Sequence, residues 1–126
     1  MEIIDNIEVP ETLKECYDIL NIVAEEDYDI MQDYSEKDFI ALTHHTTGRW
    51  IRNNWGLWQG NGNLCKFFKK LGIHHPDDMS SIIFSSFYRQ YHGLPINIDE
   101  QVEHYRNYWT SCNINPDTMK EIKTNG

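Results

Sequence analysis

The segment Trp50–Asn63, WIRNNWGLWQGNGN, decides the fold because it joins an amphipathic helical pattern to a loop. It holds three of the chain's four Trp residues beside Arg, Gly and Asn. Gly56, Gly60 and Gly62 interrupt helical periodicity, so residues 55–63 are expected to form a loop. The segment is therefore either the centre of a small core or a binding surface.

Upstream of this loop, Ser35 and Asp38 start a helix that is expected to run to about residue 54. Its inward stripe is expected to comprise Phe39, Leu42, Thr46, Arg49, Trp50 and Asn53. On this stripe Trp50 belongs to the core, and Arg49 is expected to be buried against a carboxylate of the acidic N-terminal segment. Trp55 and Trp58 border the loop, and Trp58 is expected to be partly exposed.

Capping signals predict four further helices, so the expected fold is an all-α bundle of about five helices. One spans about residues 12–26 and begins with a Thr12/Glu15 capping box. Another begins at Asn63 and ends at Gly72 in a left-handed conformation. The others span about 76–92, where Pro76 begins the helix, and 97–111, where Asn97 and Glu100 form a capping box. Residues 25–33 are expected to form a charged connection.

The length and the distribution of charge predict one domain whose N-terminal segment is acidic. The chain has 126 residues, of which 40% are hydrophobic, enough for one core. Residues 1–38 carry thirteen acidic and two basic residues, whereas residues 39–126 carry seven acidic and nine basic residues. The domain, 1–126, thus divides into an acidic segment 1–38, an aromatic body 39–111 and a polar tail 112–126. The acidic face either packs against the body or steers a basic partner.

Composition also bounds the compartment and the cofactors. No apolar run approaches the roughly 18 residues that span a bilayer, so no membrane association is expected and the protein is expected to be cytoplasmic. Cys16, Cys65 and Cys112 are odd in number and form no CxxC motif, which disfavours disulfides and a thiolate zinc site. The adjacent pairs His44-His45 and His74-His75 lack metal-ligand spacing, so no metal and no cofactor is expected.

Three stretches carry a resemblance to a known family: WIRNNWGLW, LCKFFKKLGIHHPDDMS and GLPINIDEQVEHYRNYW. In this order, and with the shorter pieces GIHHPDDMS and YRNYW within them, they resemble a family of small, mostly bacterial domains of unknown function. The resemblance covers roughly Phe39 to Trp109. It implies a compact unit with that order of motifs, and it implies no activity and no catalytic residues.

Each possible reaction centre has a structural explanation. Asp77 and Asp78 could be a catalytic pair, but adjacent acids in a first helical turn usually complement the helix dipole. Cys65 lies near Lys66 and Lys69, which would favour a thiolate, yet no partner residues for nucleophilic catalysis are evident. The Gly56, Gly60 and Gly62 spacing is a weak phosphate-loop signal. No catalytic residue is therefore predicted, and an enzymatic activity is left open but disfavoured.

The favoured function is a non-enzymatic protein-interaction module. It would be a small acidic inhibitor, an immunity-like protein or a phage defence or anti-defence protein that binds a basic partner; direct nucleic-acid binding is disfavoured by the negative charge. The acidic residues expected to face that partner are Glu25, Glu26, Asp27 and Asp29. The alternative is a binding protein or enzyme for a phosphate- or nucleotide-containing ligand, in which Arg49, Arg52 and the Gly/Asn loop recognise the anion through a guanidinium fork. The contact residues expected for partner or ligand are Arg49, Arg52, Trp55, Trp58, Asn61 and Lys66.

Overall fold

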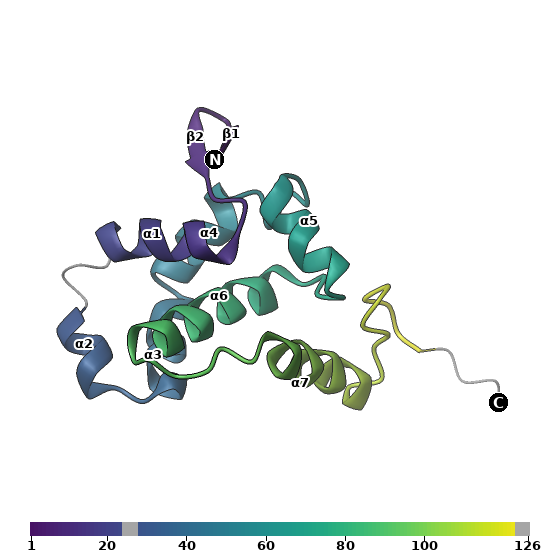
Figure 1. Cartoon of the computed structure of the whole chain (residues 1–126). Coiled ribbons are helices and arrows are strands. Elements are labelled where there is room, and N and C mark those ends of the chain that lie inside the picture. Colours follow the sequence, from purple (N-terminus) through teal and green to yellow (C-terminus); the bar gives the residue numbers. More distant parts are fainter. Residues whose placement is uncertain (24–27, 123–126) are drawn as a thin grey trace.

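The computed structural model describes residues 1–23 and 28–122, which form seven helices and one antiparallel hairpin (Figure 1). The expectation of a mostly helical chain is confirmed, whereas the number of helices and the hairpin were not predicted. The elements are β1 (Glu2–Ile4), β2 (Ile7–Val9), α1 (Leu13–Val23), α2 (Tyr28–Asp33), α3 (Glu36–His44), α4 (Thr47–Asn54), α5 (Asn63–Lys70), α6 (Pro76–Tyr91) and α7 (Ile98–Ser111).

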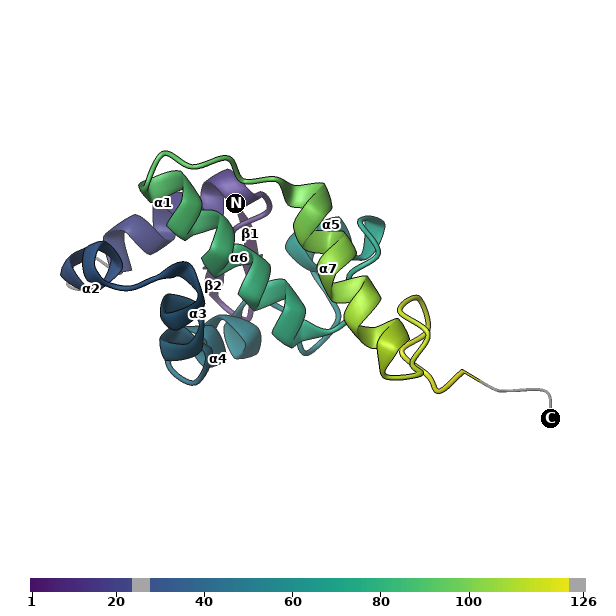
Figure 2. The ribbon, with the colours of Figure 1, turned by 90° about the horizontal axis from the view of Figure 1, so that it is seen from below.

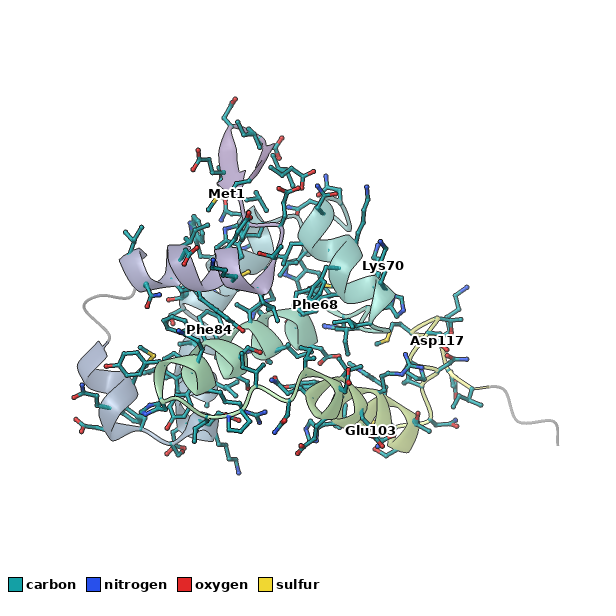
Figure 3. The ribbon with its side chains drawn as sticks, viewed as in Figure 1. Met1, Phe68, Lys70, Phe84, Glu103 and Asp117 are labelled. Carbon is teal, nitrogen blue, oxygen red and sulfur yellow. The ribbon has the colours of Figure 1, made fainter. Side chains whose placement is uncertain are left out.

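Helix α6 is the centre of the molecule. Helices α1, α3, α4 and α7 all pack against it, and the views in Figures 1 and 2 show α6 running between α1 and α3 on one side and α7 on the other. Every residue from Ile82 to Tyr88 is buried, so α6 meets neighbours around its whole circumference. Figure 3 shows Phe84 and Phe68 pointing into the interior, where both side chains are buried.

The helix expected over residues 35–54 is broken into α3 and α4. Thr46 lies between them with φ −111° and ψ −103°, outside the helical region. The Thr43 and Thr46 hydroxyls bond to carbonyl oxygens in the preceding turn of α3, a pattern that competes with regular helix geometry. A Cβ on Gly48 would lie 2.7 Å from Thr43 O, so the two short helices approach too closely for any other residue.

The break shifts the buried stripe of α4 along the sequence. The buried positions are Gly48, Ile51, Arg52 and Trp55, at helical spacing. The predicted core position of Trp50 is wrong, since 46% of its surface is exposed. The predicted burial of Arg49 is also wrong: Arg49 is exposed, and Arg52 is the buried arginine, only 4% exposed.

The charged connection expected over residues 25–33 contains a short helix, α2. Met31 is fully buried, and its carbonyl oxygen lies 2.8 Å from His92 Nε2 beyond the end of α6. Tyr88 of α6 donates from its hydroxyl to Tyr34 O at 2.7 Å. The buried side chain of Met31 and these contacts hold α2 in place.

The first nine residues form a hairpin that has no counterpart in the predicted helical bundle. Strands β1 and β2 pair with Ile4 opposite Ile7, and the turn residues Asp5 and Asn6 have φ of 50° and 66°. Positive φ at both central positions is the geometry of a tight hairpin turn, for which Asp and Asn are favoured. The hairpin lies beside α5, where Glu2 Oε1 accepts a hydrogen bond from Asn63 N at 2.8 Å.

Most of the predicted helix ends are confirmed. Ser35 accepts a hydrogen bond from Asp38 N at the start of α3, and His75 directly precedes Pro76 as the N-cap of α6. Gly72 follows α5 with φ 89°, as expected for a left-handed terminus. The capping box at Asn97 and Glu100 is wrong, because Asn97 has φ 50° and its side chain makes no capping bond.

The tail after α7 is held more tightly than its composition suggests. Asp117 pairs with Arg106 of α7 at 2.9 Å, and Ile114 forms a β-bridge with Glu121. The tail is therefore folded back on itself up to Ile122. Among the helices of residues 1–23 and 28–122, none has the length and apolar character needed to cross a membrane.

Arg52 joins three helices at one buried point. Its Nη2 donates to His44 O at the end of α3 at 2.7 Å, and its Nη1 donates to Ser80 Oγ in α6 at 2.9 Å. Its Nε lies 3.3 Å from Asp77 Oδ1 in the first turn of α6. The guanidinium thus satisfies a carbonyl at the C-terminus of α3 and bonds to two side chains near the start of α6.

We expect Arg52→Met to lower the free energy of unfolding by about 2–3 kcal/mol, because His44 O, Ser80 and Asp77 lose their shared donor. Urea unfolding followed by circular dichroism measures the change. The matched control is Arg49→Met, on the exposed side of α4, which should stay within about 0.5 kcal/mol of the unchanged chain. Equal losses in the two variants would contradict the role assigned to Arg52.

Candidate functional site

The Gly/Asn loop between α4 and α5 exposes one tryptophan and buries the residues beside it. Trp58 N donates to Arg52 O at 3.2 Å, so the loop continues directly from the buried arginine. Leu57 is buried and anchors the loop, whereas 53% of the Trp58 surface is exposed, as predicted. The glycines at 56, 60 and 62 all have positive φ, which lets the chain turn sharply on both sides of Trp58.

Trp58 begins a continuous row of aromatic side chains at the N-terminal end of α6. Its ring centroid lies 5.7 Å from that of His75, and the His75 ring stacks on Trp109 of α7 at 5.4 Å with an interplanar angle of 24°. Tyr108 packs edge-on against Trp109 at 5.3 Å and is 54% exposed. We call Trp58, His75, Trp109 and Tyr108 the aromatic row. Its two ends are the exposed ones.

A buried carboxylate fixes the centre of the row. Asp78 Oδ2 accepts a hydrogen bond from Trp109 Nε1 at 2.6 Å, and Asp78 is only 8% exposed. Burial raises the pKa of Asp78 above its ordinary value, although the bond from Trp109 and the nearby His75 act in the opposite direction. The Trp109 ring is therefore held in one orientation by a group that is costly to keep ionised.

Asp77 connects this row to Arg52. Its backbone N donates to His75 Nδ1 at 3.0 Å, which fixes the His75 ring as the cap of α6, while its carboxylate pairs with Arg52. The Asp77 side chain is still 43% exposed. The row is thus bordered by a carboxylate that can also meet a ligand or partner.

The six predicted contact residues differ in their exposure. Arg52 and Trp55 are buried, so their expected place in a contact surface is wrong: the shifted phase of α4 turns both inward. Arg49, Asn61 and Lys66 are exposed, as a contact role requires, but none belongs to the aromatic row. Trp58 is the predicted residue that does.

The acidic residues expected to face a partner lie mostly beyond what the structure describes. Glu25, Glu26 and Asp27 fall outside the described residues. Asp29 lies in α2, and the placement of its side chain is likewise outside the description. Their role in steering a partner therefore stays a prediction.

The possible phosphate loop is covered by the chain's own carboxylates. The N-terminus of α5, which would attract an anion, already donates from Asn63 N to Glu2 and from Asn63 Nδ2 to Glu11. A Cβ on Gly62 would lie 3.0 Å from Glu2 Oε1, so this carboxylate sits directly on the loop. A phosphate at this place would have to displace two acidic side chains.

Cys65 does not have the environment of a nucleophile. It is buried, and burial raises the pKa of its thiol more than Lys69 lowers it. Among the described residues, no group of three or more His, Cys, Asp and Glu side chains is arranged to hold a metal ion.

Sequence reasoning missed the pairing of His75 and Asp78 with Trp109. Both residues lie in the motif IHHPDD, and Trp109 lies 31 positions after Asp78. A single sequence gives no signal for a contact across that separation. The sequence held one weaker hint of this contact: His75 before Pro76 and two acidic residues after it make this helix start unusually polar.

We expect Asp78→Asn to raise the melting temperature at pH 7, because Asn keeps an oxygen for the Trp109 N–H and removes a buried charge. A carboxyl whose pKa is higher in the folded chain binds protons more tightly when folded, so its ionised form costs stability above that pKa. The cost disappears as the pH falls through the folded pKa toward the unfolded value. The advantage of Asp78→Asn should therefore shrink as the pH approaches about 4.

Thermal unfolding between these two pH values is the measurement. Asp99→Asn, at an exposed acid in the first turn of α7, is the control and should show no such advantage at pH 7. A lower melting temperature for Asp78→Asn than for the unchanged chain at pH 7 would show that the ionised carboxylate is stabilising, contrary to this account.

Comparison with known proteins identifies the family and no individual relative. The family model described as Domain of unknown function (DUF6794) matches residues 9–91, from β2 to the end of α6. Trp58, His75 and Asp78 lie within the matched region, whereas Trp109 and Tyr108 lie beyond it. No curated protein and no solved structure matches the chain. Because the match spans well over half of the 126 residues, the chain belongs to the DUF6794 family of domains of unknown function.

Proposed function

We propose that this chain is a protein-interaction module that binds a basic partner through the aromatic row. The observation that carries the proposal is the continuous contact of Trp58, His75, Trp109 and Tyr108 across three separate parts of the chain. Trp and Tyr are among the residues most enriched at the energetic centres of protein interfaces. A row that is rigid at its centre and exposed at both ends can bury large aromatic surface with little loss of side-chain entropy.

The sign of the surrounding charge favours a cationic partner. The half-exposed Asp77 borders the row, and the chain has a net charge of −9. An arginine or lysine side chain of a partner could lie over an exposed ring and pair with this carboxylate. Nucleic acid is disfavoured, because the phosphate contacts that dominate its affinity would meet a negative molecule.

The alternative of a phosphate or nucleotide ligand has weaker support. Of the two arginines it required, Arg52 is not free, since all three of its nitrogens have partners, whereas Arg49 is exposed. The N-terminus of α5 is covered by Glu2 and Glu11. An inhibitor, immunity-like or defence-related role agrees with the proposed module, because such proteins act by covering a basic functional surface of another protein.

Trp58→Ala should weaken binding of the partner by at least about tenfold, because it removes an exposed end of the row without touching the core. The tagged chain is used as bait in a lysate of its host, and the affinity for the retained protein is then measured by calorimetry. Trp50→Ala is the matched control, since Trp50 is 46% exposed and lies outside the row. The proposal is overturned if the two variants lose affinity equally, or if the retained molecule is acidic or is a phosphorylated metabolite.

The acidic segment should act on the rate of association. Replacing Glu25, Glu26, Asp27 and Asp29 together by Lys should slow association with the same partner by about tenfold at low salt. The difference should vanish at high salt, because screening removes long-range attraction. Stopped-flow mixing at two ionic strengths measures both rates, and an unchanged rate at low salt would sink the steering role of these residues.

A further inference from the structure

A second site lies between α3, α6 and α7, on the face of α7 that is turned toward the other two helices. It is a half-open pocket of about 490 Å³, a volume typical of sites for small molecules. We call it the interhelix pocket, and the residues that matter for its chemistry are Glu36, Lys37, Arg89, Glu100, Gln101 and Tyr105. Trp58, His75 and Trp109 do not line it, so it is separate from the aromatic row.

Two cationic side chains, Lys37 and Arg89, line the pocket, and the guanidinium of Arg89 is already satisfied. Arg89 donates to Glu36 from Nε at 2.6 Å and from Nη2 at 3.0 Å, and its Nη1 donates to Ile96 O at 2.7 Å. The three nitrogens are therefore engaged, and the guanidinium is a poor receptor for an anion. The hydrogen bond to Glu36, together with the charges of Glu36 and Glu100, raises the pKa of Arg89 although burial acts in the opposite direction.

One hydrogen-bond acceptor in the lining of the pocket has no donor within the described part of the chain. Gln101 is 6% exposed, and its Nε2 donates to Ser86 Oγ and to Ile96 O. The donation to Ile96 O fixes the orientation of the amide, since the reversed amide would place two oxygens together. Gln101 Oε1 is then buried without a hydrogen bond from any residue that the structure describes. Such an atom in a native fold calls for a donor.

The rim adds a second acceptor and an apolar wall. Glu100 is exposed beside Gln101, whereas Lys37 and His104 are exposed and can turn to solvent. Tyr105 and Ile40, both half-buried, line the wall, and an aromatic ring there can face a cation. Because Gln101 Oε1 is covered by its neighbours, contact with a ligand requires the side chain to rotate, and Nε2 then gives up its bonds to Ser86 and Ile96.

We propose that the interhelix pocket binds a small organic ammonium group, held by the Glu100 carboxylate and by Gln101 Oε1 against Tyr105. The ammonium supplies the donor that Gln101 Oε1 lacks and a charge that pairs with Glu100, while the exposed side chain of Lys37 turns to solvent. The same group is offered by a free alkylamine and by a lysine side chain. The pocket is thus a site for amines, in addition to the interaction surface around Trp58.

The test is a titration of the full ¹⁵N-labelled chain by nuclear magnetic resonance at physiological salt. The probes are 1,4-diaminobutane, its uncharged counterpart 1,4-butanediol, the dianion glutarate, and Nα-acetyl-lysinamide. Diaminobutane should shift the side-chain amide resonances of Gln101 in a saturable way, whereas butanediol and glutarate should not. If acetyl-lysinamide alone shifts them, the source of the ammonium is a lysine side chain of a polypeptide.

Glu100→Gln should weaken amine binding by about tenfold, because it removes the charge-assisted hydrogen bond and keeps the shape of the side chain. Glu103→Gln is the matched control: Glu103, labelled in Figure 3, is an exposed acid on the same helix and does not line the pocket. Trp58→Ala should leave amine binding unchanged, which separates this site from the aromatic row.

The proposal is overturned by any of three results: no saturable shift with either amine up to about 10 mM, equal shifts with butanediol, or equal losses in Glu100→Gln and Glu103→Gln. The last result would mean that the amine responds only to the overall negative charge. Because Glu100 is exposed, its substitution tests the site without the unfolding that a change at Gln101 could cause.

Discussion

The buried guanidinium of Arg52 is the interaction on which the arrangement of this fold depends. It takes up a carbonyl at the end of α3, a hydroxyl within α6 and a carboxylate in the first turn of α6. A charge only 4% exposed is tolerated in a core when its donors are matched, and removing one partner leaves the others unsatisfied. The bond to His44 O explains why α3 ends where it does, and the approach of Gly48 to Thr43 O brings α4 within reach.

The same interaction places the aromatic row. Arg52 holds Asp77, whose backbone N–H donates to His75 Nδ1, and His75 then lies between Trp58 and Trp109. Asp78, next along the first turn, fixes the Trp109 ring from α7. The first turn of α6 thus links the buried Arg52 to the aromatic row, through Asp77 and Asp78. Burial raises the pKa of Asp78, and a buried carboxylate beside an exposed surface makes that surface a candidate for binding.

The sequence predicted the local features of this molecule better than its long-range contacts. The helix at 76–92, the cap at Ser35, the turn at Gly72 and the exposure of Trp58 follow from neighbouring residues, and all are present. The break at Thr46 was missed because residues 35–54 keep a helical pattern on both sides of it. The predicted stripe was therefore out of phase within α4, so Trp50 and Arg49 were expected to be buried, whereas Trp55 and Arg52 are the buried residues. The contact of Asp78 with Trp109 spans 31 residues and had no local signal.

Some carboxylates of the acidic N-terminal region stabilise the fold, and others remain exposed. Glu2 and Glu11 meet the N-terminus of α5, and Glu36 pairs with Arg89, so these three carboxylates stabilise the fold itself. Asp5, Glu8, Asp18, Asp33 and Asp38 are exposed and keep their charge toward solvent. Complementary packing and attraction of a basic partner were alternatives at the level of the sequence, but they need not compete. The exposed carboxylates left over from that packing are the ones that would attract the basic partner proposed above.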